Sequence, residues 1–294
     1  MQFLTSLYRS PQTRTGLILL TFVVLVALAA PLLAPFSPVN VDPAARLLPP
    51  LSRAAASSAG SSAPAAHAEA ALHVLGTDSV GRDVLSRLIY GSRLSLTVGF
   101  LAVLISAVFG SLVGSLSGYW GGWVEALSAW LIDVQLSFPF LLLAIFLLGA
   151  LGGGTVAVVL VLALGTWVNY ARIVRAQVLS IKNQGYVEAA HATGAGTLRI
   201  LFVHILPNTL SPICVVGSFS MALAILTEAG LSFLGVGLDP STPSWGTMLN
   251  DGRDYLLTAW WVATMPGIAI GVTVLGVTLF GEGLRELLDP RGLR

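Results

Sequence analysis

The stretch LSLTVGFLAVLISAVFGSLVGSLSG, residues 94–118, contains no charged side chain. The hydrocarbon core of a bilayer is about 30 Å thick, so a helix needs about 20 consecutive, mainly apolar residues to cross it. This stretch is long enough and apolar enough to do so. It therefore predicts a transmembrane helix.

Five further segments have the same character, and together with 94–118 they predict six membrane crossings. These segments lie at about 16–35, 125–149, 155–175, 209–235 and 259–283. The composition agrees, because 55% of the residues are hydrophobic and 10% are charged, against roughly 25% charged in ordinary soluble domains. We predict an all-α membrane protein with about six transmembrane helices.

The first apolar segment admits two interpretations. Arg9 and Arg14 precede it, and Ala27-Leu28-Ala29 imitates the cleavage site of a signal peptide. However, the apolar run from Gly16 to Phe36 is longer than the roughly 7–15 residues of a signal-peptide core. An uncleaved anchor helix is therefore the favoured interpretation.

The basic residues indicate which side of the membrane each loop occupies. With six crossings both termini share one side, and placing them in the cytoplasm puts nine Lys and Arg residues inside and six outside. Cytoplasmic loops carry an excess of these residues. The sequence thus favours a multi-pass membrane protein with both termini in the cytoplasm.

Several function classes are disfavoured by composition. A formal net charge of +1 leaves no broad basic surface for nucleic acid. The only lysine, Lys182, is not preceded by a glycine-rich phosphate-binding loop, so the chain lacks a P-loop ATPase motif. Cys214 has no second cysteine to pair with and is interpreted as a packing residue. No two of the histidines stand at the spacing that lets one helix face hold a metal; they are His67, His73, His191 and His204.

The chain divides into three predicted regions: 1–35 with the first helix, 36–92 outside the membrane, and a five-helix core over 93–294. Within the outer region, residues 54–71 are rich in Ala and Ser, and we expect a flexible linker there. Residues 73–96 carry apolar side chains at helical spacing and predict an amphipathic surface helix. A second outer loop, 237–249, suits either docking of another protein or a plug.

Residues 186–208, YVEAAHATGAGTLRILFVHILPN, form a polar stretch of small residues in this apolar chain. The topology assigns 176–208 to the cytoplasm. Small residues leave a low surface that another protein can approach closely. After Gly196 we expect a second short helix with Thr197 as its N-cap, ended by Pro207. Four residues of this second helix are expected on one face: Leu198, Leu201, Phe202 and Ile205.

This stretch and several other blocks resemble the dipeptide/oligopeptide/nickel permease family of bacterial ABC importers, specifically its C-type membrane subunit. The cytoplasmic stretch is similar to the "EAA" loop of such permeases. The further blocks are LGTDSVGRDVLSRLIYGSRLSL, DVQLSFPFLLLAI, YARIVRAQVLSIKNQGYVEAA, HILPN, EAGLSFLGVGLDPSTPSWGTML and GLRELLDPR. They cover roughly 200 residues in one order, which makes coincidence very improbable.

The resemblance implies a complex of this chain with a second permease, two ATPase subunits and an extracytoplasmic substrate-binding protein. ATP and Mg would be bound by the ATPase subunits, and this chain itself would need no cofactor. The coupling loop would span 182–208, with contacts to an ATPase made by Glu188, Ala189, Ala190, Gly194 and Pro207. ATP-driven closure of the ATPases would move this loop and switch the pathway between inward and outward access.

The sequence departs from the family pattern in two places, once in the coupling loop and once in the outer linker. His191 and Val203 occupy places where family members often have arginine, which makes the loop less basic. The Ala- and Ser-rich outer linker is longer than usual. The first departure concerns partner contacts, and the second concerns only the outer face.

Acidic residues in or near the predicted helices are further candidates, because a charge in a bilayer is costly unless it is paired or faces water. Asp133 and Glu228 are expected to contact either the substrate pathway or the partner permease, and Glu125 belongs to the same group. Arg172 and Arg175 follow the fourth predicted span and are expected to reach lipid head groups, with a direct contact to an ATPase as the alternative.

Three other functions remain alternatives to peptide import. A nickel importer is the closest, although nickel prefers nitrogen ligands and no histidine falls within a predicted span. An ATP-independent channel would not need the coupling loop. An intramembrane enzyme is the weakest alternative, because no serine, histidine and acid fall at one depth, and no catalytic residue is assigned.

Overall fold

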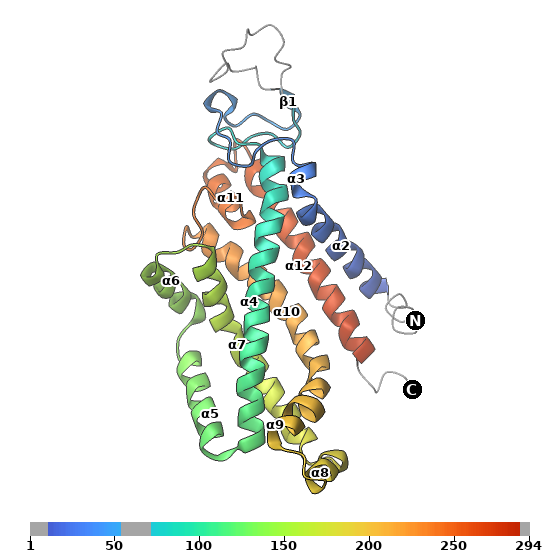
Figure 1. The fold of residues 1–294 in the computed structure, drawn as a ribbon. Helices are drawn as coiled ribbons and strands as arrows, with labels where there is room; N and C mark the ends of the chain where they lie inside the picture. The colour runs from blue at the N-terminus through green and yellow to red at the C-terminus, as the bar shows by residue number, and fades with distance from the viewer. Residues whose placement is uncertain (1–10, 54–71, 289–294) are drawn as a thin grey trace.

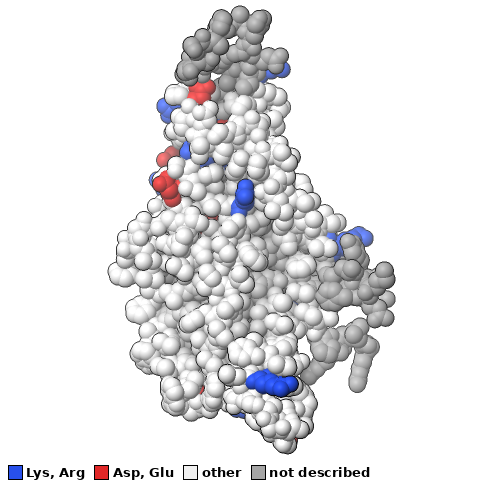
Figure 2. Space-filling model, viewed as in Figure 1, with Lys and Arg blue, Asp and Glu red and all other residues white. Residues whose placement is uncertain are grey.

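The computed structural model describes residues 11–53 and 72–288 and is a long helical bundle with a loop-rich cap (Figure 1). The cap holds β1 (Ser52–Arg53) and β2 (Leu72–His73), which pair antiparallel, and the short helices α3 (Ala30–Leu33) and η1 (Pro43–Ala45). The predicted linker at 54–71 lies outside the described residues. Figure 2 shows charged side chains mainly toward this cap, above a broad uncharged face.

The bundle contains five helices that are long and apolar enough to span a membrane. They are α2 (Pro11–Leu28), α4 (Val84–Trp120), α7 (Thr155–Ile181), the helical stretch Thr197–Phe233, and α12 (Trp261–Leu288). The stretch Thr197–Phe233 consists of α9 (Thr197–Arg199), η2 (Ile200–Ile205) and α10 (Leu206–Phe233). A bent pair, α5 (Gly122–Leu136) and α6 (Phe140–Leu151), would make a sixth span. The prediction of an all-α membrane protein with about six spans is confirmed.

The third predicted span, 125–149, is not one straight helix. Its two halves, α5 and α6, meet at an angle of 88°. Pro139 stands as the N-cap of α6, and a proline disfavours helical backbone at the residue before it. The chain therefore bends at Ser137 to Pro139 instead of continuing.

The predicted amphipathic helix over 73–96 is also corrected. The helix begins only at Val84, where the Asp83 side chain accepts a hydrogen bond from the Ser86 backbone N–H and caps the first turn. Residues 74–83 form turns rather than helix, and Arg87 and Ile89 are buried inside the protein. The helix then continues to Trp120 without a break, so residue 92, where the predicted outer region ends, lies inside α4.

Close packing of α4 against α7 forms the centre of the bundle. Gly110, Gly114 and Gly118 recur every four residues on the face of α4 that meets α7. A methyl group at Gly114 would overlap the backbone of Ala171, so only glycine permits this approach. Small residues at such spacing let transmembrane helices pack with their backbones close together.

The remaining elements close the two ends of the bundle. The cap, which is the predicted outer end of the bundle, is completed by α11 (Trp245–Gly252) and η3 (Arg253–Tyr255), which follow α10. At the opposite end lies α8 (Gly185–Ala192), beyond the last turn of α7 (Figure 1). The predicted coupling loop and the outer loops therefore lie at opposite ends of the molecule.

Candidate functional site

The turn after α8 is fixed by a C-terminal cap that requires glycine. Gly194 has φ +82°, its N–H donates to the carbonyl of His191 at 2.9 Å, and the N–H of Ala195 donates to the carbonyl of Ala190 at 3.0 Å. This pair of bonds is the Schellman motif, in which the left-handed residue is usually glycine. Gly194 thus has a conformational role that the sequence reasoning, which considered only its small surface, missed.

Apolar contacts hold α8 and the following turn firmly against the end of α7. One side of each element is buried, while the other side faces away from the bundle. The buried members are Val187, Ile200, Leu201 and Ile205, and they pack with Val174, Val178 and Ile181 of α7. This cluster makes the segment a rigid extension of the bundle.

The face of α8 and the following turn that points away from the bundle combines small residues with exposed apolar ones. Glu188, Ala189 and Gly194 are exposed, and the Glu188 carboxylate makes no hydrogen bond or ion pair with the described residues. Around them, large apolar side chains are 44% to 63% exposed; these are Tyr186, Leu198, Phe202 and Val203. Exposed apolar groups gathered in one place are typical of a protein interaction surface.

Two details at the start of the second helix differ from the sequence prediction. Gly196, not Thr197, is the N-cap of α9. Leu198 and Phe202 are exposed, so they do not share the buried face of Leu201 and Ile205.

Pro207 does not end the helix, which continues through it into α10. The six residues of η2 form a π-helix, and the N–H of Leu206 bonds to the carbonyl of Leu201, five residues back. A proline removes one backbone donor, and a π turn is a local adjustment that accommodates such a loss. Pro207 itself is exposed near the start of α10.

Side-chain hydrogen bonds join α8 to the neighbouring helices. The ring of His191 lies 3.2 Å, Nε2 to hydroxyl oxygen, from Tyr119 near the end of α4, and the two rings are stacked. Lys182 donates to the carbonyl of Gly118 at 3.0 Å. Asn208 donates to the hydroxyl of Tyr186 at 3.4 Å. The segment is thus tied to α4 as well as to α7 and α10.

Glu228, one of the two predicted membrane carboxylates, is fully buried within α10. Its Oε2 accepts a hydrogen bond from Ser95 of α4 at 3.1 Å, and its Oε1 accepts one from Ser232 at 2.9 Å. In this conformation the carboxylate joins α10 to α4. A contact with substrate or with a partner permease stays a prediction.

Asp133, the other predicted carboxylate, lies on α5 and is exposed. It lines a cavity of about 150 Å³ between α4, α5 and α7, together with Glu125, Arg172 and Arg175. The structure therefore brings together the charged residues that the sequence analysis considered separately. Within 11–53 and 72–288, no three His, Cys, Asp or Glu side chains gather as a metal site.

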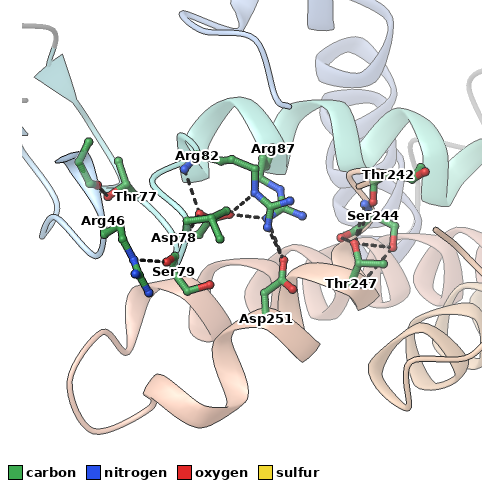
Figure 3. Close-up of polar contacts among 12 residues, drawn as sticks. Arg46, Thr77, Asp78, Ser79, Arg82, Arg87, Thr242, Ser244, Thr247 and Asp251 are labelled. Atoms are coloured by element: carbon green, nitrogen blue, oxygen red, sulfur yellow. Dashed lines mark hydrogen bonds and ion pairs between the residues drawn. The ribbon is translucent and has the colours of Figure 1, made fainter. Parts of the chain in front are cut away.

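A buried ion network at the outer end was not predicted from sequence (Figure 3). Asp78 and Asp251 each pair with both Arg82 and Arg87 at distances of 2.5 to 2.9 Å. Burial raises the pKa of Asp78, but the two guanidinium groups and two backbone N–H donors outweigh this, so its pKa lies below the ordinary value of 3.8. The network joins the turn before α4 to the end of α11.

Comparisons with known proteins identify the family. Residues 110–293 match the family described as binding-protein-dependent transport system inner membrane component. Residues 2–50 match the N-terminal TM domain of oligopeptide transport permease C, which favours the anchor interpretation of the first helix.

Curated relatives and solved structures agree with this match. The chain is 41% identical over 276 residues to the di/tripeptide transport system permease protein DppC of Pseudomonas aeruginosa, covering 94% of this chain and 87% of the relative. It is also 41% identical to the dipeptide transport system permease protein DppC of Haemophilus influenzae, covering 94% and 89%. A chain of the inward-facing MetNI methionine ABC transporter has the same fold, with a TM-score of 0.56 at 19% identity, covering 69% of this chain and 96% of that one.

The family assignment confirms that this chain is a multi-pass inner-membrane transport component and not itself an ATPase. The helical bundle, the anchored turn after α7 and both sequence matches lead to one assignment. This chain belongs to the binding-protein-dependent transport system inner membrane components, as a permease of the oligopeptide permease C type.

Proposed function

We propose that this chain forms the translocation pathway of an ATP-driven importer of di- or oligopeptides, together with a second permease. The names of its relatives support this substrate class, since both DppC proteins are dipeptide or di/tripeptide permeases at 41% identity over nearly the whole chain. Two ATPase subunits would bind ATP and Mg, and an extracytoplasmic binding protein would deliver the peptide. This chain would contribute the membrane pathway and the surface that receives the ATPase motion.

The observation that carries the coupling role is the geometry of α8. The face of α8 and of its following turn that points away from the bundle exposes Glu188, Ala189 and Gly194 among large apolar side chains. The opposite face of α8 is anchored by Val187 in the cluster at the end of α7. A low, partly apolar surface on a rigid support suits insertion into a groove of another protein. Pro207 and Ala190 belong to the same segment and would support this surface.

The connections of α8 supply a route for the motion. The segment continues through α9 and η2 into α10, which runs toward the outer end of the bundle (Figure 1). The buried apolar residues of the segment also pack against α7, and His191 contacts Tyr119 at the end of α4. A displacement of α8 would therefore shift three helices together as rigid bodies, which is the kind of motion that opens one side of a pathway and closes the other.

The orientation follows from the same proposal. If α8 meets ATPases, its end of the bundle is cytoplasmic, and the cap with β1 and α11 is extracytoplasmic. The first residues of α2 and the last residues of α12 point away from that cap (Figure 1). This arrangement supports cytoplasmic termini, and it puts the loop at 237–249 where a binding protein could reach it.

The test uses Gly194→Trp in the complete complex, reconstituted with both permeases, the ATPases and the binding protein. A Cβ atom built at Gly194 meets no atom within 4 Å, so the tryptophan would project from the coupling surface, although the left-handed backbone at φ +82° strains any L side chain there. We expect peptide-stimulated ATP hydrolysis and peptide uptake to be lost while the protein still inserts in the membrane.

The matched control is Gly194→Asn, because asparagine tolerates the left-handed backbone at φ +82° and has a small side chain. It should retain most of the stimulated hydrolysis. Full coupling in the tryptophan variant would refute docking at α8. Absence of ATP-dependent peptide uptake by the unmodified complex would refute the substrate class.

A further inference from the structure

The cavity between α4, α5 and α7 collects charged side chains inside the helical bundle. Its lining includes Glu125 and Asp133 from α5 and Arg172 and Arg175 from α7, with Gly114 and Ser117 of α4 behind them. Both α7 and the α5–α6 pair are candidate membrane spans. The four formal charges sum to zero. Two of these side chains form an ion pair with each other, the closed pair, and the other two do not, the open pair.

The closed pair is an ion pair within the chain, between Arg175 Nη2 and Glu125 Oε1. The open pair consists of Asp133 and Arg172. Both side chains are exposed, and neither makes a hydrogen bond or ion pair with any residue in 11–53 or 72–288. A carboxylate and a guanidinium thus border one cavity with their hydrogen-bonding groups unused.

Helix geometry separates the residues of the open pair along the bundle. Helices α5 and α7 run in opposite directions (Figure 1), so the steps from Glu125 to Asp133 and from Arg175 to Arg172 lead the same way along the bundle. At about 1.5 Å per residue these steps are about 12 Å and about 4.5 Å. Taking the closed pair as level, the backbone positions of Asp133 and Arg172 are offset by about 7.5 Å along the axis.

Unpaired charges on candidate membrane-spanning helices do not fit a lipid-facing surface. A charged side chain in the middle of a helix span costs roughly 2.5–3.5 kcal/mol even on insertion scales, and such residues generally face a water-filled cavity or a partner group. The cavity already opens beside both groups. A water-filled pathway is therefore the environment that suits Asp133 and Arg172 best.

We infer that Asp133 and Arg172 form a binding site for the two charged ends of a zwitterionic dipeptide on its way through the membrane. The Asp133 carboxylate accepts hydrogen bonds from the peptide α-ammonium group, and the Arg172 guanidinium donates to the peptide α-carboxylate. An extended dipeptide is about 7 Å long, which is comparable with the axial offset between the two residues, and both side chains border the same cavity. This inference rests on the proposed function, because it assumes that the transported substrate is a peptide.

The experiment introduces a thiol at Ala129, an exposed residue of the same cavity lining. It uses the assembled complex of permeases and ATPases without the binding protein, so that peptide recognition by that protein cannot contribute. The native thiol of Cys214 is exposed and is first removed by Cys214→Ala. The rate at which a charged, water-soluble maleimide alkylates the Ala129→Cys variant is measured with and without dialanine.

We expect the thiol to be alkylated from water and dialanine to slow the reaction. N-acetyl-dialanine and dialanine amide, which each lack one charged end, should protect poorly. Asp133→Asn and Arg172→Gln should each raise the dialanine concentration needed for half protection roughly tenfold or more, since each removes a charge-assisted hydrogen bond. The conservative variants Asp133→Glu and Arg172→Lys should restore part of the protection.

Arg93→Gln is the matched control, because Arg93 is exposed near the outer end of α4, outside the cavity. It should leave protection unchanged. An unreactive thiol in the assembled complex, or equal protection by dialanine and its blocked derivatives, would overturn the inference. If wild-type uptake of dialanine is normal and the Asp133 and Arg172 variants protect like wild type, only this site fails; if the wild-type complex transports no dipeptide, the proposed function fails as well.

Discussion

Replacing Arg87 with methionine should destabilise the outer end of the bundle far more than the same change at an exposed arginine. The Arg87 side chain is 1% exposed, and its Nη1 lies 2.5 Å from Asp78 Oδ2 and 2.9 Å from Asp251 Oδ2. Removing one partner of a buried ion pair costs roughly 3–5 kcal/mol. Arg82 still contacts both acids, so we expect the lower end, about 3 kcal/mol, a factor of roughly 100 in the folding equilibrium.

The assay is an SDS titration in mixed micelles, followed by tryptophan fluorescence. Two buried tryptophans report on this end of the protein, because Trp245 donates to the carbonyl of Leu88 and Trp261 to that of Thr77. Arg93→Met is the matched control on the same helix, and its effect should stay within about 0.5 kcal/mol. If Arg87→Met costs no more than Arg93→Met, the network does not stabilise the fold.

A double-mutant cycle checks the assignment to the network. Asp251→Asn removes one of the two acids that Arg87 contacts, and the Asp251 side chain is 23% exposed. Residues that share one network have coupling energies of roughly 0.5–3 kcal/mol. Additive losses in the Arg87→Met, Asp251→Asn double variant would refute the direct interaction even if each single variant is destabilised.

Three other perturbations test different parts of the structure. Gly114→Ala should cost about 1–3 kcal/mol in the same titration because its methyl group overlaps Ala171, whereas Gly149→Ala, which meets no atom within 4 Å, should be neutral or slightly stabilising. Folding lowers the pKa of Asp78, so the contribution of its carboxylate to the free energy of unfolding is present above about pH 4 and is lost as the pH falls through its pKa in the folded protein. The free energy of unfolding should therefore drop more steeply below about pH 4 in wild type than in Asp78→Asn. His191→Ala should reduce binding-protein-stimulated ATP hydrolysis several-fold with little change in unstimulated hydrolysis, because it removes the contact of α8 with Tyr119, and equal loss of both activities would contradict this role.

The positions of the membrane helices could be predicted from sequence because apolar length alone determines them. Residues 155–175 and 209–235 lie almost wholly within α7 and α10, whose ends differ from the prediction by a few residues. The bend between α5 and α6 was missed, although Pro139 was a visible signal in the middle of an apolar run. Apolar composition indicates that a segment lies in the membrane, but it does not indicate whether the segment crosses in one straight helix.

The segment after α7 lies at the end of the bundle away from the cap, as its predicted place in the chain requires, but its shape was only partly predictable and its coupling role stays a prediction. A glycine that requires a left-handed backbone and one that merely leaves space look the same in a single sequence, so the cap at Gly194 could not be distinguished. The π-helical turn before Pro207 was equally hidden, because the rule that proline ends a helix does not include this local adjustment. Whether Glu188 contacts an ATPase stays a prediction.

The outer network shows why charge pairing escapes an analysis by periodicity. Asp251 stands more than 160 residues after Arg82 and Arg87, and no local pattern links them. The amphipathic pattern over 73–96 places Arg82, Asp83 and Arg87 on the polar face of the predicted surface helix, because charged side chains usually face water. In the folded chain these same charges are buried, since Asp251 at the end of α11 brings a second carboxylate to them and Asp83 caps α4. The four charges that pair directly, Arg82 and Arg87 with Asp78 and Asp251, sum to zero, and they connect the turn before α4 with α11. If α8 is displaced as proposed, the shift of α10 would reach the outer loops through α11 and this network rather than through α10 alone.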